Sequence, residues 1–101
     1  MEDYKLSIIA PDDFHHHFRD ENDSDCGLGM LSLTCKSAGR QFNRVIVMPN
    51  TKPPIRTTDE ALLYKQRILH SLATIEDKNI TFQPLMTLYL TDNTKLEFRY
   101  L

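Results

Sequence analysis

Apolar residues along the chain alternate between short extended runs and longer periodic stretches. Residues 44–48 (Arg-Val-Ile-Val-Met) form a continuous β-branched run, which predicts a strand covered on both faces. Residues 79–90 are also rich in strand formers, and Pro84 lies early enough to mark a strand start or an edge. Nearer the N-terminus, residues 5–10 and 14–18 are predicted as short extended segments, with a turn at the proline and two aspartates between them.

Two stretches carry a helical pattern. Residues 27–42 show a loose helical repeat of apolar positions, and Gly39 near the end is predicted to terminate the helix. A second helix is predicted to begin after Thr57, because Thr57 and Glu60 have the spacing of a capping box. Its buried face is expected to consist of Ala61, Tyr64, Ile68 and Leu72, with Leu62 and Leu69 beside them.

The predicted order is strand, helix, strand, helix, strand, with polar loops at residues 20–26 and 50–55. This alternation is typical of parallel βαβ units with right-handed crossovers, so we expect an α/β fold. In such sheets the catalytic and ligand-binding residues lie beyond the carboxyl ends of the strands. The candidate positions are therefore residues 13–20, Asn50 and residues 91–92.

Composition narrows the class of protein. The 101 residues include 12 basic and 14 acidic side chains, which give a net charge of −2. No basic stripe with interleaved aromatic residues is present, so nucleic acid is not expected as a partner. The sequence lacks a secretory signal pattern and an apolar run of membrane-spanning length, so we expect a cytoplasmic protein with no membrane partner. Cys26 and Cys35 are expected to be reduced thiols, because their number and spacing suit neither a disulfide framework nor a zinc knuckle.

Three consecutive histidines, at positions 15, 16 and 17, are the most informative local feature. Alternation along a strand sends every second side chain to the same face. One face then carries His15, His17 and Arg19. The opposite face carries Phe14, His16 and Phe18, whose aromatic rings are expected to pack under a covering helix. Two histidines spaced in this way can place both ring nitrogens about 2.0–2.1 Å from one zinc ion, and Arg19 can hold a substrate carboxylate through a two-point fork.

A solvated polar loop is the competing interpretation of the histidine tract. Acidic residues at positions 12, 13, 20, 21, 23 and 25 surround the histidines, and they suit metal binding and a loop equally. A calcium loop starting at Asp20 does not fit, because Asp25 stands where its glycine belongs and Leu31 where its glutamate belongs. Cys26 stays open as a further metal ligand, beside the alternative of an inert thiol.

Three motifs follow one another between residues 5 and 92. They are the His-x-His-x-Arg-Asp sequence of residues 15–20, the Met-Pro-Asn turn of residues 48–50 before two adjacent prolines, and the strand-like residues 84–92. Together they resemble dihydroorotases of the single-function microbial and plant type, within the amidohydrolase superfamily. The resemblance implies a zinc hydrolase of pyrimidine biosynthesis that interconverts two small molecules, N-carbamoyl-L-aspartate and L-dihydroorotate.

The resemblance also implies roles for individual residues. The implied zinc ligands are His15 and His17, and the implied carboxylate-binding residues are Arg19 and Asn50. His16 takes a non-ligand position. The family's site holds two zinc ions bridged by hydroxide and a carboxylated lysine, and a late aspartate moves the proton. The lysine, two further histidines and this aspartate are expected beyond Leu101, so no catalytic set is complete within the chain.

The implied fold is the first three βα units of a TIM (β/α)8 barrel, incomplete in this chain. Residues 1–101 would form this N-terminal barrel portion, with residues 93–101 as a divergent tail. The isolated chain is therefore expected to be inactive, and a homodimer is compatible with the full-length enzyme. Two hypotheses of another class stay open. One is a non-catalytic truncated or degenerate product, or a small metal-binding module that keeps His15 and His17; the other is an interaction partner that uses exposed strand edges.

Overall fold

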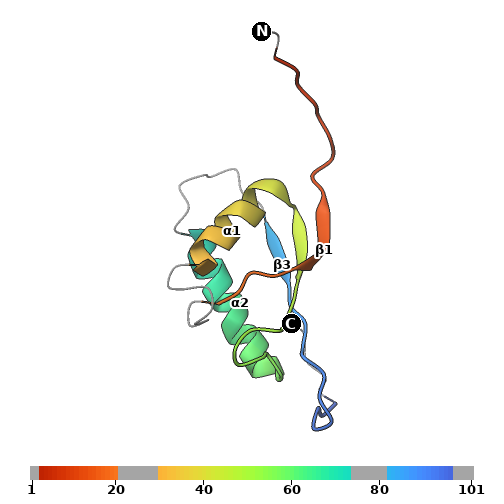
Figure 1. The fold of residues 1–101 in the computed structure, drawn as a ribbon, viewed down its shortest axis with the longest axis vertical. Helices are drawn as coiled ribbons and strands as arrows, with labels where there is room; N and C mark the ends of the chain where they lie inside the picture. The colour runs from red at the N-terminus through yellow and green to blue at the C-terminus, as the bar shows by residue number, and fades with distance from the viewer. Residues whose placement is uncertain (1–2, 21–29, 74–81, 97–101) are drawn as a thin grey trace.

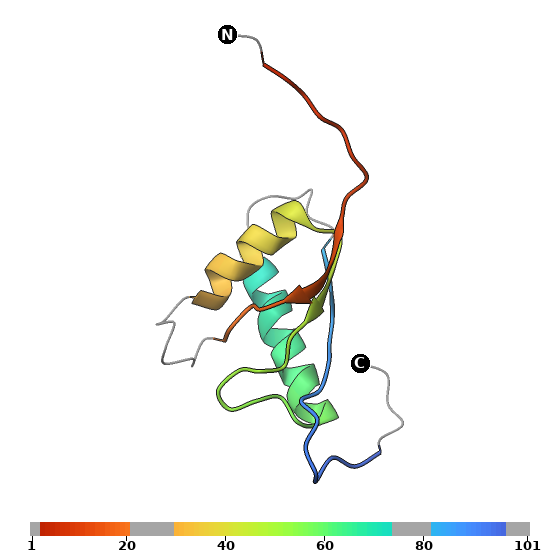
Figure 2. The same ribbon diagram turned by 45° about the vertical axis from the view of Figure 1, so that its right-hand side comes forward.

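The computed structural model describes residues 3–20, 30–73 and 82–96. Within them, the elements in chain order are β1 (Asp12–His16), α1 (Met30–Gln41), β2 (Arg44–Val47), α2 (Thr58–Ala73) and β3 (Gln83–Leu85). The strands form a parallel sheet in the order β1-β2-β3. Both helices cover the same face of this sheet (Figures 1 and 2). The expected α/β fold with a parallel sheet is confirmed.

The strand order explains why the helices share one face. Right-handed crossovers that always step in the same direction return on the same side of a sheet. A doubly wound sheet reverses direction and carries helices on both faces, whereas a β/α barrel never reverses. The sheet β1-β2-β3 therefore has the arrangement of consecutive units of a barrel.

Neither helix in the described ranges has the length and hydrophobicity of a membrane span.

The core lies between the sheet and the two helices. Its fully buried side chains come from every layer and include Phe18, Leu31, Cys35, Val45, Val47, Tyr64 and Ile68. The prediction of a strand at residues 44–48 is confirmed, but the helices cover β2 on one face only. Ile46, which points to the other face, is partly exposed. In a β/α barrel, the sheet face opposite the helices lines the barrel interior.

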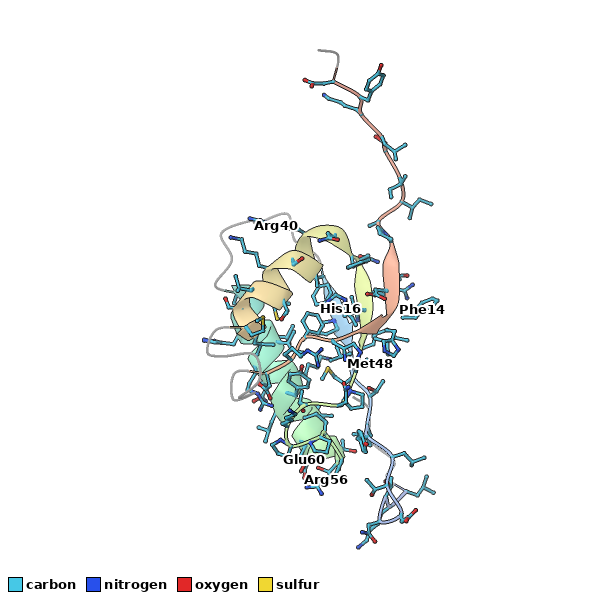
Figure 3. All side chains as sticks on the ribbon, in the orientation of Figure 1. Phe14, His16, Arg40, Met48, Arg56 and Glu60 are labelled. Carbon is cyan, nitrogen blue, oxygen red and sulfur yellow. The ribbon has the colours of Figure 1, made fainter. Side chains whose placement is uncertain are left out.

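The start of α2 agrees with the sequence pattern. The backbone N–H of Glu60 donates to Thr57 Oγ1 at 3.2 Å, and Glu60 Oε2 accepts from the backbone N–H groups of Thr57 at 3.2 Å and Arg56 at 2.6 Å. This is the predicted capping box, and it lies at the carboxyl-end side of the sheet (Figure 3). The predicted buried face is confirmed for Ala61, Tyr64 and Ile68, with Leu72 partly buried against the core.

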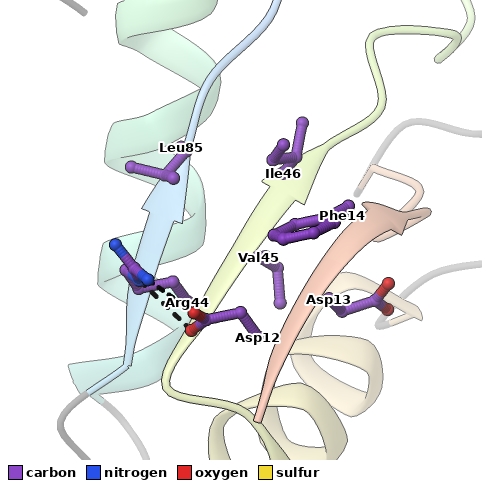
Figure 4. A pocket seen from close by; sticks show the side chains of 7 residues that line it. All are labelled: Asp12, Asp13, Phe14, Arg44, Val45, Ile46 and Leu85. Atoms are coloured by element: carbon purple, nitrogen blue, oxygen red, sulfur yellow. Dashed lines mark hydrogen bonds and ion pairs between the residues drawn. The ribbon is translucent and has the colours of Figure 1, made fainter.

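The N-terminal end of the sheet differs from the prediction. Asp12 and Asp13 do not form a turn but begin β1. The reason is a cross-strand ion pair, in which Arg44 of β2 donates to both carboxylate oxygens of Asp12 at 3.2 and 2.5 Å (Figure 4). Residues 5–10 are exposed and unpaired in the described part of the chain, and they project away from the sheet (Figure 1). Without a partner strand, the backbone N–H and C=O groups of this apolar run have no inter-strand hydrogen bonds, so no strand forms there.

Two further element boundaries differ. Gly39 does not end α1 but is buried inside it, and the helix continues to Gln41. Without a side chain, this position allows close packing, which overrides the tendency of glycine to terminate helices. β3 is shorter than predicted, with Pro84 buried at its centre. The predicted helix start at residues 27–29, the strand start at residues 79–81 and Cys26 lie outside the described residues.

The cross-strand ion pair predicts an acid-sensitive contribution to stability. Hydrogen bonds from Arg44 lower the pKa of Asp12. A carboxyl group with a depressed folded-state pKa stabilises the fold above its unfolded pKa of about 3.9, and this contribution is lost as the pH falls through the folded value. We expect urea midpoints at pH 7 and about pH 2.5 to differ less in Asp12→Asn than in the unchanged chain. The effect should be small because the pair is exposed, and an equal fall in both proteins would contradict it. Asp92→Asn is the matched control.

Burial also predicts the reactivity of Cys35. Desolvation raises the pKa of this thiol to about 12, and the thiolate is the reactive form. In a Cys26→Ser variant, where Cys35 is the single thiol, alkylation at pH 8 should be slower in buffer than in urea by about 10³-fold or more. Mass spectrometry of iodoacetamide labelling measures both rates. Equal rates would show that Cys35 is not enclosed between α1 and the sheet.

Candidate functional site

The end of β1 contains an irregularity that shapes the site. Between Asp13 and His16 the register with β2 shifts, so that Phe14 and His15 both lie opposite Ile46. Two residues facing one is the arrangement of a β-bulge, which redirects the side chains around it. After the bulge, His15 and His17 lie on one side of the chain and His16 and Phe18 on the other, as predicted.

The bulge overturns the prediction for Phe14. Instead of packing under a helix, Phe14 is 75% exposed on the open side of the sheet, near Ile46 and Leu85 (Figure 4). His16 and Phe18 do face the helices as predicted, with ring centroids 4.7 Å apart. Figure 3 shows Phe14 pointing outward and His16 pointing toward the helices. One extra residue in the strand therefore separates the first aromatic ring from the other two.

The ring of His16 contacts residues other than His15 and His17. Its Nδ1 lies 2.8 Å from Asp13 Oδ2, and its ring contacts Phe42 at a centroid distance of 5.8 Å. The hydrogen bonds from His16 and from the backbone N–H of His15 lower the pKa of Asp13. Asp13 lies within the candidate range of residues 13–20, but the sequence analysis did not predict its bond to His16. Its signal was its position two residues before His15, the spacing at which an aspartate bonds a backbone N–H.

The other two histidines converge at the carboxyl end of the sheet. The Nε2 atoms of His15 and His17 are 3.0 Å apart, with ring centroids separated by 4.9 Å. His17 Nδ1 lies 3.0 Å from Asn50 Oδ1, which follows β2. Because an amide oxygen only accepts, Nδ1 of His17 is the donor in this contact, and Nε2 is the nitrogen that faces His15. Three of the four predicted site residues therefore meet at one edge of the sheet.

Arg19, the fourth, lies two residues beyond His17. Its side chain is exposed, and its backbone has a φ of 64°, in the left-handed region that is uncommon for residues other than glycine. Within the described ranges, no hydrogen bond joins Arg19 to Asn50. The structure thus brings His15, His17 and Asn50 into contact and places Arg19 in a turn at the same end of β1.

The histidine pair fits a zinc ion in geometry. Two nitrogen ligands of a tetrahedral zinc are separated by about 3.3 Å, close to the Nε2 separation observed here. The bond from His17 to Asn50 is the kind of outer contact that fixes the tautomer and orientation of a metal-binding histidine. Among the residues that the structure describes, no three His, Cys, Asp or Glu side chains are grouped to hold a metal. Two histidine nitrogens are fewer than the four ligands of a tetrahedral zinc site.

Two known proteins with similar sequences are both named dihydroorotase. Dihydroorotase from Nitrosococcus oceani is 48% identical over 89 residues, which are 88% of this chain and 23% of the relative. Dihydroorotase from Cupriavidus pinatubonensis is 45% identical over 93 residues, which are 92% of this chain and 24% of the relative. The resemblance to dihydroorotases is confirmed.

Structural similarity agrees with the sequence matches. The crystal structure of dihydroorotase from Campylobacter jejuni superposes with a TM-score of 0.64 and 34% identity, covering 80% of this chain and 21% of that protein. A comparison with protein-family models finds no match. The chain spans about a quarter of the length of the dihydroorotases it matches.

Proposed function

We propose that this chain contributes half of a zinc site and the substrate-carboxylate site to a dihydroorotase. The enzyme would interconvert N-carbamoyl-L-aspartate and L-dihydroorotate in pyrimidine biosynthesis. The observation that carries the proposal is the convergence of His15 and His17, beside Asn50, at the carboxyl edge of the sheet. The similarity to proteins named dihydroorotase supports the choice of reaction.

The residues of this chain would bind two different groups, a zinc ion and a substrate carboxylate. His15 and His17 would hold zinc, which when bound polarises an amide carbonyl and lowers the pKa of a water molecule. The Oδ1 atom of Asn50 is engaged by His17, so its amide NH2 group remains to donate to a substrate carboxylate. Arg19 would grip the same carboxylate through its planar fork. Asp13 keeps His16 on the core side of the strand, away from the metal.

Residues 1–101 would be part of an amidohydrolase barrel, with residues 93–101 as a divergent tail. The barrel would act in the cytoplasm on a small molecule, with neither nucleic acid nor membrane as partner. The full-length enzyme would carry two zinc ions, a carboxylated lysine from further sequence, and a surface compatible with a homodimer.

A chimeric enzyme tests this function. The matching segment of the Nitrosococcus oceani dihydroorotase is replaced by this chain, and L-dihydroorotate hydrolysis is followed by its ultraviolet absorbance. We expect zinc-dependent activity that a chelator removes and added zinc restores. A folded chimera without activity would contradict the proposal.

The isolated chain should show no turnover in the same assay. A tetrahedral zinc needs more ligands than His15 and His17, and the expected general base lies outside the chain. Turnover by the isolated chain that is lost in His15→Ala and with chelator would contradict this prediction, because a complete site would then exist within 101 residues.

A further inference from the structure

The backbone of Arg19 is held in its left-handed conformation by a side chain from α2. The phenolic hydroxyl of Tyr64 donates a hydrogen bond to the carbonyl oxygen of Arg19. Tyr64 is 1% exposed, so its hydroxyl depends on this protein partner. Burial also raises the pKa of Tyr64, which keeps the hydroxyl protonated as a donor. The left-handed φ of Arg19 is thus matched by a buried contact specific to that carbonyl.

The residues on both sides of Arg19 are anchored as well. Arg67 of α2 donates two hydrogen bonds to the buried carboxylate of Asp20, at 3.0 and 2.7 Å. Its guanidinium carbon lies 5.3 Å from the ring centroid of Tyr64, three residues earlier on the same helix face. On the other side, Thr34 Oγ1 of α1 donates to the carbonyl of Phe18 at 2.7 Å. Helices α1 and α2 therefore bond three consecutive residues, at the backbone carbonyls of Phe18 and Arg19 and at the side chain of Asp20.

The side chain of Arg19 differs from this anchored backbone. It is exposed, and it pairs with no acidic side chain in the part of the chain that the structure describes. A bidentate grip on a carboxylate requires a guanidinium whose origin and direction are fixed. Contacts before, at and after Arg19 fix the point from which its side chain leaves the turn, and they leave its guanidinium group exposed.

We propose that Tyr64 and Arg67 are positioning residues, which hold the left-handed turn so that the Arg19 guanidinium is aimed at a carboxylate ligand beside His17. The carboxylate part of this inference rests on the proposed function. The positioning residues act through the backbone of Arg19 and through Asp20, and they need no contact with the ligand.

Nuclear magnetic resonance of the 101-residue chain tests the proposal with Tyr64→Phe, which removes only the hydroxyl. Three signals are followed: the one-bond Hα–Cα coupling of Arg19, which reports the sign of φ; the Arg19 Nε–Hε shift during titration with N-carbamoyl-L-aspartate; and the zinc-induced shifts of the His15 and His17 rings. In Tyr64→Phe we expect the coupling to move to the value for negative φ and the Arg19 response to fall several-fold. The zinc-induced shifts should be unchanged.

Two further variants make the result decisive. Tyr4→Phe removes the same atom from a residue that is 91% exposed, and it should alter none of the signals. Arg67→Lys keeps the charge but loses the fork to Asp20, and it should weaken the Arg19 response even where Tyr64→Phe does not fold. A folded Tyr64→Phe or Arg67→Lys chain with an unchanged Arg19 response would overturn the proposal. The proposal would also be overturned if the Arg19 Nε–Hε signal of the unmodified chain did not shift on addition of N-carbamoyl-L-aspartate. Failure of the proposed zinc site is seen separately, as absent His15 and His17 shifts in the unmodified chain.

Discussion

Replacing His17 with alanine in the chimeric enzyme is expected to abolish dihydroorotate hydrolysis. The change deletes the Nε2 atom that lies 3.0 Å from His15 Nε2, and it also releases Asn50 from its bond to the ring. Loss of a metal ligand removes both the polarising ion and the activated water, a loss on the order of 10³-fold or more in rate. Initial rates and zinc content measured on the same preparation test the prediction.

His16→Ala is the matched control for this result. It removes the same type of side chain from the adjacent position, whose ring bonds Asp13 and faces the core. We expect this variant to keep its zinc and most of its activity. If His16→Ala lost the metal while His17→Ala retained it, the assignment of strand faces would be wrong by one residue.

Replacing Phe18 with alanine is expected to have the largest effect on stability. Phe18 is completely buried, and its ring contacts His16 on one side and Phe82 at a centroid distance of 5.8 Å on another. Truncating a buried phenylalanine costs about 3–5 kcal/mol, through lost burial and the cavity left behind. Urea unfolding of the chain, followed by circular dichroism, measures the change.

Phe14 supplies the control, because it has the same side chain four residues earlier and is 75% exposed. Phe14→Ala should change the free energy of unfolding by less than about 1 kcal/mol. Equal losses for the two variants would show that the bulge in β1 is not present in solution, since Phe14 would then share the core with Phe18.

Local sequence was sufficient where structure is determined locally. The capping box at Thr57 and Glu60 predicted the start of α2, and the run at residues 44–48 predicted β2, because both patterns depend on residues close together in the chain. The bulge at Phe14 could not be predicted in this way, since it depends on how β1 aligns with a strand 32 residues later. The same holds for Asp12, whose partner Arg44 converts an expected turn into a strand.

The same distinction between local and long-range contacts applies to the candidate site. Alternation along a strand predicted that His15 and His17 share a side, and their contact agrees with that expectation. Asn50 was a candidate because it follows a predicted strand, and its carboxylate-binding role came from the resemblance. Its contact with His17 could not be predicted locally, because 33 residues separate the two. Tyr64 was expected only as a core residue. Its apolar spacing indicates burial, but the partner of its hydroxyl is a carbonyl 45 residues away, which no local pattern identifies.

Zinc titration of the isolated chain, followed through the nitrogen resonances of the histidine rings, tests the half-site most directly. We expect one zinc ion per chain to shift the Nε2 signals of His15 and His17 together and to leave His16 and His70 unchanged. Dialysis should remove this zinc, because two ligands fill only half of a tetrahedral site. A shift at His16 or His70 in place of the pair would contradict the site. One equivalent of zinc that survives dialysis would instead identify a dedicated metal-binding module.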